Sequence, residues 1–125
     1  MAGEQILVVE DNEKNMKLVR DVLQASGYRT LEAATGEVAL DLAREHGPAL
    51  VLMDVQLPGM DGRSALARLR GDVLTASIPV VALTAQAMHG DRERFVAAGF
   101  DGYLAKPIDI AELVAAVATY CGRPR

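Results

Sequence analysis

The sequence predicts an α/β fold in which five parallel strands form one sheet and five helices cover its two faces. Three short apolar runs, Ile6–Val9, Leu50–Met53 and Val80–Leu83, have the length of strands and no polar face. Such runs are typical of central strands in a parallel sheet that helices cover on both sides. Helical segments lie between them, and this alternation of strand and helix gives a parallel sheet with right-handed crossovers.

The first two helices have clear capping residues. Asn12 is suited to cap a helix that ends just before Gly27, which would be its C′ residue. A weaker strand candidate follows at Tyr28–Ala33. Thr35 is suited to cap the second helix, which is expected to end at Gly47-Pro48.

The third and fourth helices have less sharp boundaries. The third is expected to begin near Asp61 and to fade around Gly71. The fourth is expected to begin between Gln86 and Asp91 and to stop at Gly99.

The fifth strand is weak, but the fifth helix is clear. The strand candidate is Asp101–Ala105, and Asp109 and Glu112 have the spacing of a capping box at the start of the helix. The apolar residues of this helix repeat at helical period: Ile110, Leu113, Val114, Val117 and Cys121. Five strand–helix units in this length favour the flavodoxin-like, doubly wound fold, whose strand order 2-1-3-4-5 is taken by analogy.

Length and composition indicate one domain, residues 1–125, without an effector domain. Half of the residues are hydrophobic, so a core can form without disulfides, and the single cysteine, Cys121, fits a reducing compartment. The net charge of −4 and the scattered basic residues disfavour direct binding of nucleic acid. No targeting segment is visible, and no apolar run approaches the ~20 residues of a membrane-spanning helix. We therefore expect a cytoplasmic monomer.

Charged and polar residues follow the predicted strands. In a doubly wound sheet, ligands bind outside the carboxyl ends of the strands. Each such residue alone would be read as a cap or turn former, but several carboxylates and one lysine at a single edge indicate a site. The residues at the strand ends are Glu10, Asp11, Asp54, Thr84 and Lys106.

The three carboxylates indicate a divalent cation. Glu10, Asp11 and Asp54 would repel one another at the edge of the sheet, which calls for a cation or a raised pKa. Mg²⁺ suits such a set because it keeps several waters besides one or two carboxylates. The backbone carbonyl of Gln56 is a further candidate ligand. Calcium buffering is the alternative, but the sequence has no EF-hand loop.

Asp54 is also a candidate nucleophile. A carboxylate can form an acyl phosphate, and phosphoryl transfer needs charge neutralisation and positioning above all. Mg²⁺ and Lys106 would cradle the phosphoryl oxygens, the Thr84 hydroxyl would donate a hydrogen bond, and the small Ala85 would leave room. A cis peptide bond before Pro107 would aim Lys106 back into the site.

Four motifs at the strand ends resemble those of the response regulator receiver family. They are Val9-Glu10-Asp11-Asn12, the run from Leu52 to Gly62 (LMDVQLPGMDG), Leu83-Thr84-Ala85 and Lys106-Pro107. The resemblance runs from about Ile6 to Cys121. Some stretches, such as that from Asp11 to Leu18, are most similar to the stand-alone DivK-type receivers of bacterial cell-cycle control.

The resemblance implies a phosphorylation-dependent switch in two-component signalling. It implies that a histidine kinase or histidine phosphotransfer protein phosphorylates Asp54, that Glu10 and Asp11 hold the metal, and that Thr84 and Lys106 contact the phosphoryl group. Tyr103 matches the aromatic residue that turns inward in the family, and the other reading is an ordinary strand aromatic. The fourth helix, fifth strand and fifth helix would bind the output protein. The family acts as a switch that assists its own phosphorylation and dephosphorylation, not as an enzyme with an outside substrate.

Three other functions fit parts of the pattern. A phosphohydrolase of the haloacid-dehalogenase type would carry Asp-x-Asp after the first strand and a cap insertion, whereas this chain has Glu10-Asp11-Asn12-Glu13 and no cap-sized segment. A flavin carrier would cradle a phosphate in the same loop, which is acidic here. An adaptor whose phosphorylation does not matter stays open.

Overall fold

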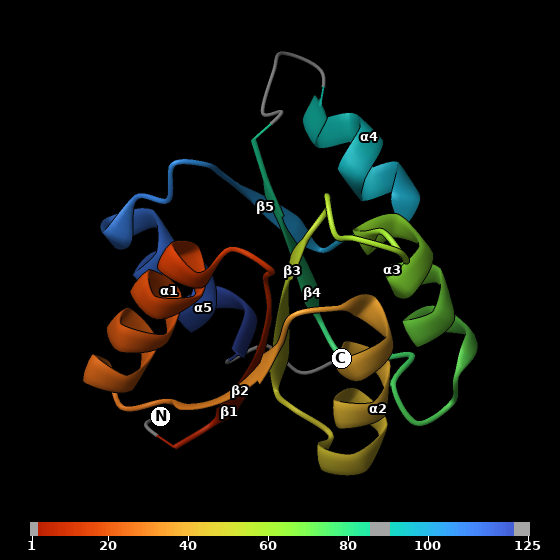
Figure 1. The fold of residues 1–125 in the computed structure, drawn as a ribbon, viewed down its shortest axis with the longest axis horizontal. Coiled ribbons are helices and arrows are strands. Elements are labelled where there is room, and N and C mark those ends of the chain that lie inside the picture. Colours follow the sequence, from red (N-terminus) through yellow and green to blue (C-terminus); the bar gives the residue numbers. More distant parts are fainter. Residues whose placement is uncertain (1–2, 86–90, 122–125) are drawn as a thin grey trace.

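The structure of the protein is a computed structural model that describes residues 3–85 and 91–121, without the side chains of residues 91 and 92. Ten elements alternate along the chain, as the sequence predicts (Figure 1). They are β1 (Gln5–Val9), α1 (Glu13–Ala25), β2 (Arg29–Ala33), α2 (Gly36–His46), β3 (Leu50–Asp54), α3 (Gly62–Gly71), β4 (Val80–Thr84), α4 (Asp91–Ala98), β5 (Gly102–Ala105) and α5 (Ile110–Cys121).

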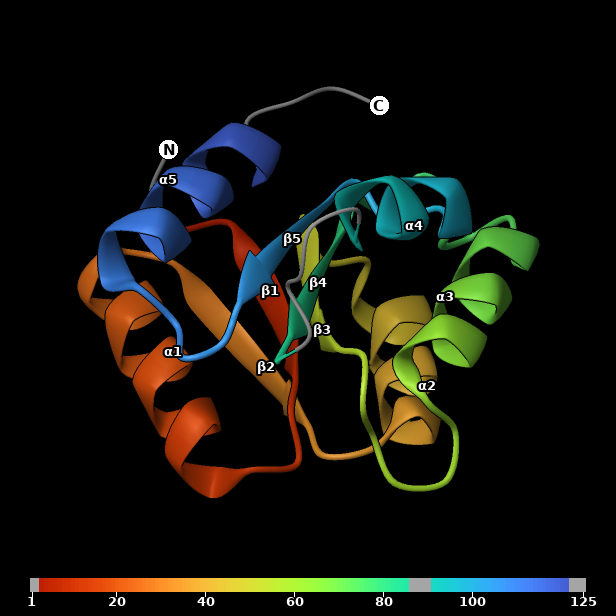
Figure 2. The ribbon, with the colours of Figure 1, turned by 90° about the horizontal axis from the view of Figure 1, so that it is seen from above.

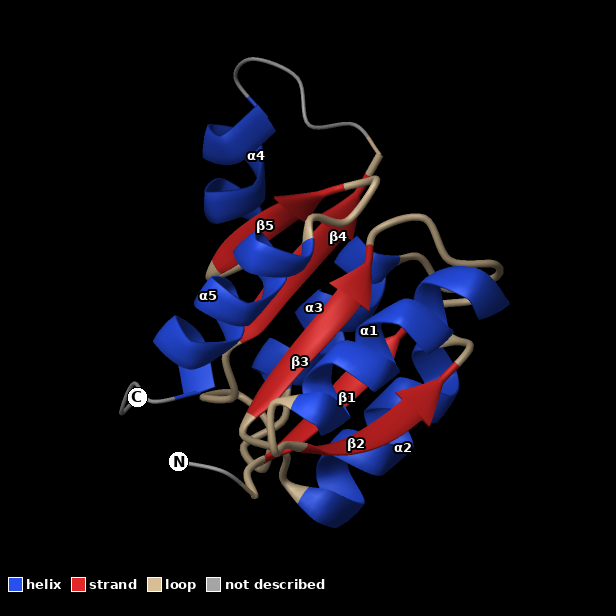
Figure 3. Ribbon diagram, turned by 90° about the vertical axis from the view of Figure 1, so that its left-hand side faces the viewer, coloured by secondary structure: helices blue, strands red, loops and turns tan. Residues whose placement is uncertain are grey.

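The five strands form one parallel sheet in the order β2-β1-β3-β4-β5, which confirms the predicted topology. Figures 1 and 2 show α1 and α5 on one face of the sheet and α2, α3 and α4 on the other. Figure 3 shows the sheet with its strands running in the same direction. The carboxyl ends of all five strands therefore lie at one edge.

Each central strand contributes to two cores because its side chains alternate between the faces of the sheet. In β1, Leu7 and Val9 pack under α2 and α3, whereas Ile6 and Val8 pack under α1 and α5. All four side chains are fully buried. This burial on both faces explains why the central strands have no polar face in the sequence.

The helix ends follow the capping residues expected from the sequence. The side chains of Asn12, Thr35 and Asp61 accept hydrogen bonds from backbone N–H groups in the first turns of α1, α2 and α3. Gly47 ends α2 in the left-handed conformation. α4 begins at Asp91, inside the expected interval, and residues 86–90 of that interval lie outside the described residues.

The apolar stripe of α5 is only partly covered. Leu113 and Val117 are fully buried against the sheet and α1, but Ile110 and Val114 are 53% and 38% exposed. Cys121, expected in the core, is partly buried. Helical period predicts the stripe, but the packing of neighbouring elements decides how much of it is covered.

Arg70 ties together several segments at the amino ends of the strands. Its guanidinium group donates hydrogen bonds to the carbonyl oxygens of Ala76, Ile78 and Gly99 and to Asp101 Oδ2. Asp101 Oδ2 also accepts a hydrogen bond from Val80 N. This contact fixes the end of α3, the start of β4 and the turn before β5 relative to one another. None of the helices that the structure describes has the length and apolar character needed to cross a bilayer.

Candidate phosphoryl-acceptor and metal site

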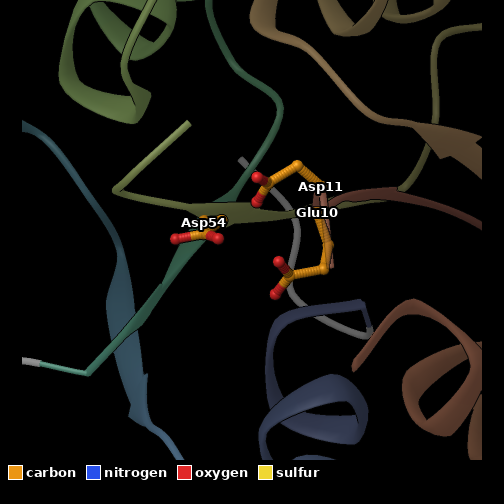
Figure 4. Close-up of side chains that lie close together, drawn as sticks. All are labelled: Glu10, Asp11 and Asp54. Carbon is orange, nitrogen blue, oxygen red and sulfur yellow. The ribbon is translucent and has the colours of Figure 1, made fainter. Parts of the chain in front are cut away.

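The parallel register brings the acidic residues of β1 and β3 to the same edge of the sheet. Val9 pairs with Met53, so Glu10 and Asp11 leave β1 beside Asp54, the last residue of β3. Figure 4 shows the three carboxylates converging on a common space. One carboxylate oxygen from each residue lies within 4.8 Å of the others. Glu10 and Asp54 are only 2% and 4% exposed, whereas Asp11 is exposed.

Lys106 brings a positive charge into this cluster from the far end of the chain. Its ammonium nitrogen lies 2.7 Å from Glu10 Oε1 and 3.0 Å from Asp54 Oδ2. The backbone N–H of Lys106 donates to the carbonyl of Thr84 and fixes the residue at the end of the sheet. The peptide bond between Lys106 and Pro107 is cis.

Burial and like charge act against the ionised form of Glu10. Burial raises the pKa of Glu10, while the contact with Lys106 and the hydrogen bond from Asn12 N lower it, and neighbouring Asp54 raises it again. The net shift is upward. Burial acts to lower the pKa of Lys106, but its contacts with Glu10 and Asp54 outweigh that effect and raise it.

The donor set fits a hard divalent cation. Glu10 Oε1 is buried and receives no directed hydrogen bond within the described residues, although the Lys106 ammonium is near. One ammonium cannot balance three crowded carboxylates, so a further cation is a natural partner for the cluster. Glu10, Asp11 and Asp54 make an all-oxygen set, which Mg²⁺ and Ca²⁺ prefer over softer ligands.

The loop between β3 and α3 holds Asp54 from a second direction. The backbone N–H of Gln56 donates to Asp54 Oδ1 over 2.9 Å. The backbone N–H of Gly62, the first residue of α3, donates to the carbonyl of Val55 and closes the loop at its base. The loop therefore begins and ends against the end of β3.

The remaining candidate residues lie on β4 and β5. Thr84 is the buried last residue of β4, and Ala85 follows it in an exposed bend. Tyr103 in β5 is partly buried, and its ring centroid lies 5.7 Å from that of Phe95 in α4. Thr84 and Lys106 thus lie at the same edge of the sheet as Asp54. Tyr103 is the second residue of β5, farther from this edge, and packs in the core beneath α4.

Two hollows lie near these residues. A cleft of about 580 Å³ extends from Glu10 and Asp11 along α1, where Lys17 and Arg20 line it, and to Glu32 of β2. A groove of about 560 Å³ runs along β5 between α4 and α5. Neither hollow could be predicted from the sequence, because both depend on the distances between the helices and the strands.

Comparison with known proteins agrees with the geometry. The family model of the response regulator receiver domain matches residues 6–118 of the chain. The chain belongs to the response regulator receiver domain family. This receiver domain is 47% identical over 117 residues to the polar-differentiation response regulator DivK of Brucella ovis, and the match covers 94% of this chain and 95% of that protein. The resemblance to DivK-type receivers is confirmed.

Solved structures show the same fold. The receiver domain of a sensor histidine kinase from Pseudomonas aeruginosa PAO1 superposes with a TM-score of 0.89 at 39% identity, covering 98% of this chain and 100% of that one. That crystal structure has a magnesium ion coordinated in its active-site cleft. The receiver domain of the Francisella response regulator 1452 gives a TM-score of 0.90 at 28% identity, over 98% of this chain and 100% of that one.

Sequence reasoning missed how closely Lys106 engages Glu10. It placed Lys106 as a partner of the phosphoryl group, whereas in the structure the ammonium bridges Glu10 and Asp54. It also gave no role to Gly62, whose close approach to Asp54 is visible only in coordinates. The one available signal was the glycine at the end of the run from Leu52 to Gly62.

Proposed function

We propose that this receiver domain, residues 1–125 acting as one unit, accepts a phosphoryl group on Asp54 from a histidine kinase or a histidine phosphotransfer protein. The observation that carries the proposal is the meeting of Glu10, Asp11, Asp54 and Lys106 at one edge of the sheet. A structural ion pair would need one carboxylate for one ammonium. Two further carboxylates beside Asp54 are better explained by a cation-dependent reaction of Asp54.

Glu10, Asp11 and Asp54 would hold Mg²⁺, with the backbone carbonyl of Gln56 as a further ligand. The crowding of three carboxylates around one ammonium supports this assignment, and the exposed Asp11 leaves the site open to water. When bound, the ion supplies positive charge that offsets the charge of the phosphoryl oxygens.

The reaction is a transfer of one phosphoryl group between two nucleophiles. A carboxylate oxygen of Asp54 forms a bond to phosphorus while the bond from phosphorus to the donor imidazole nitrogen breaks. The electron pair stays on that nitrogen, which takes up a proton as it leaves. Lys106, 3.0 Å from Asp54 Oδ2, would neutralise a phosphoryl oxygen. Thr84, which ends β4, and Ala85, which follows it, would border the phosphoryl group. Hydrolysis of the acyl phosphate returns the switch to its first state.

Output would run through protein contact at the face made by α4, β5 and α5. The groove along β5 and the exposed Val96 that lines it support this assignment. Tyr103 borders the groove and packs on Phe95, so a change in its position would alter the same face. The dispersed charge favours protein over nucleic acid as partner, and we propose a cytoplasmic monomer as the signalling form.

Labelling with a small phosphodonor tests this function. With Mg²⁺ and acetyl phosphate, we expect intact-mass analysis to show one added phosphoryl group on wild type and none on Asp54→Asn. Asp41→Asn, which changes an exposed carboxylate of α2, is the matched control and should be labelled like wild type. Hydroxylamine should remove the label, as it does from acyl phosphates. Equal labelling of wild type and Asp54→Asn would exclude Asp54, and release of many phosphates per chain from an ester would favour a phosphohydrolase.

A further inference from the structure

α3 packs its first residue directly against the backbone of the candidate phosphoryl acceptor. Gly62 is buried, and a Cβ atom added to it would overlap the carbonyl oxygen of Asp54 and lie 2.7 Å from the Cα of Val55. Cβ atoms do not approach other atoms this closely, and both contacts are with backbone, which cannot turn aside as a side chain can. A glycine is therefore required for α3 to reach this position.

α2 also packs closely against the loop between β3 and α3, but its contact is less tight than that of α3. Its first residue, Gly36, is also buried, and an added Cβ atom would lie 3.2 Å from the carbonyl oxygen of Met60 and 3.3 Å from its side chain. The loop of residues 55–61 is thus held between the amino ends of two helices. Within it, Gly59 adopts a positive φ of 73°, which favours glycine.

The loop in turn holds the groups on which the site depends. Gln56 donates its backbone N–H to Asp54 Oδ1, and its carbonyl is the proposed metal ligand. The backbone N–H of Gly62 donates to the carbonyl of Val55, the residue that precedes Gln56. A displacement of α3 away from β3 would therefore move both the carboxylate of Asp54 and the backbone of Gln56.

We propose that Gly62, and to a lesser degree Gly36, are positioning residues for the phosphoryl-acceptor site. Their bare Cα atoms let α3 and α2 close on the loop of residues 55–61, and this closure fixes the Asp54 carboxylate against Glu10, Asp11 and Lys106. The inference rests on the proposed function of Asp54 and assigns a role to residues outside the charged cluster.

Three alanine variants form a graded test. Gly62→Ala meets backbone, Gly36→Ala meets Met60 at 3.2 Å, and Gly71→Ala, at the other end of α3, meets nothing within 4 Å. Alanine is the better helix former by up to about 1 kcal/mol, so Gly71→Ala should be neutral or stabilising. Each variant is compared with wild type by urea unfolding, by Mg²⁺ titration calorimetry and by the rate of labelling with acetyl phosphate. All binding and labelling is done where circular dichroism shows the variant folded.

We expect the Mg²⁺ dissociation constant to rise and the labelling rate to fall by about tenfold or more in Gly62→Ala, because displacements near 1 Å are costly to positioned groups. We expect a smaller change of the same sign in Gly36→Ala and none in Gly71→Ala. A purely structural role of Gly62 would lower stability and leave the dissociation constant and the rate of the folded protein unchanged. That result would overturn the proposal.

Three further outcomes are informative. If Gly62→Ala does not fold, Gly36→Ala decides, and its equality with Gly71→Ala in both measurements would refute the inference. If wild type takes no label, the proposed function fails, yet the Mg²⁺ series still shows whether the glycines position the carboxylates. If wild type is labelled and all three variants match it, only the role of the glycines is lost.

Discussion

The ammonium nitrogen of Lys106 lies 3.0 Å from Asp54 Oδ2, although 52 positions separate the two residues in the chain. The same nitrogen lies 2.7 Å from Glu10 Oε1. The Lys106 side chain is 17% exposed, and those of Glu10 and Asp54 are 0% and 6% exposed. Lys106 is therefore the internal counter-ion of the cluster as well as the proposed partner of a phosphoryl oxygen.

Removal of this counter-ion should destabilise the metal-free protein. In Lys106→Met, Glu10 and Asp54 stay buried without their positive partner, so the free energy of unfolding should fall by about 1–3 kcal/mol. Mg²⁺ should restore part of this loss, because it neutralises the same carboxylates. Urea unfolding with chelator and with Mg²⁺ measures both effects.

Lys17→Met is the control for this substitution. Lys17 pairs with Asp21 one helical turn away, and both side chains are largely exposed. Solvent screens such an exposed pair, so the control should change little and should respond to Mg²⁺ like wild type. If Lys106→Met and Lys17→Met lost the same unfolding free energy, Lys106 would not act as the counter-ion of Glu10 and Asp54.

Asp11 should act on metal binding with little cost to the fold. Asp11→Asn removes one of three crowded negative charges, so the melting temperature without metal should stay equal or rise by a few degrees. The increase in melting temperature on addition of Mg²⁺ should largely disappear, since stabilisation by a ligand follows its affinity for the folded state. Thermal unfolding in chelator and in Mg²⁺ measures this. An undiminished Mg²⁺ response would remove Asp11 from the ligand set.

The pH dependence of the unfolding free energy should show that burial disfavours the ionised form of Glu10. The folded protein raises the pKa of Glu10 above its ordinary value of 4.5, so it binds this proton more tightly than the unfolded chain does. The stabilisation that this proton provides is complete below pH 4.5 and is lost as the pH rises through the pKa of Glu10 in the folded protein. Glu10→Gln keeps the neutral form at all pH values. Without metal, its advantage over wild type in unfolding free energy should grow from about pH 4 to about pH 7. An advantage that shrinks over this range would mean that the contact with Lys106 outweighs burial.

The fold and the edge that carries the site could be predicted because both follow from local patterns. Apolar runs define the strands, Asn12 and Thr35 mark the helix starts, and a parallel sheet brings the ends of all strands to one edge. The residues after β1 and at the end of β3 had to be neighbours once the strand order was known. That order itself came from analogy.

What could not be predicted depends on distances between elements. The bridging position of Lys106 depends on the direction of its side chain, and the contact of Gly62 with Asp54 depends on the angle at which α3 enters. The exposure of Ile110 and Val114 depends on what lies beside α5. Arg70 and Asp101 are 31 positions apart, and neither belongs to the four motifs at the strand ends.

The contact between Arg70 and Asp101 should govern stability without governing the site. Arg70→Met removes the ion pair with the partly buried Asp101 and removes donors from the carbonyls of Ala76, Ile78 and Gly99. We expect a loss of about 1–3 kcal/mol in unfolding free energy, because three carbonyl oxygens lose their donor while the pair itself is partly open to water. Arg68→Met, which changes an exposed arginine of the same helix, is the control and should cost less than about 0.5 kcal/mol.

Because these contacts lie at the amino ends of the strands, the folded Arg70→Met protein should keep the Mg²⁺ dissociation constant of wild type within about twofold, as expected for distant sites that do not share partners. Urea unfolding measures the stability of the variant, and calorimetry below its unfolding range measures Mg²⁺ affinity. A large loss of affinity in folded Arg70→Met would mean that the two ends of the sheet are coupled, because no carboxylate of the site contacts Arg70 among the described residues. A loss of stability no greater than that of Arg68→Met would mean that solvent already replaces these hydrogen bonds.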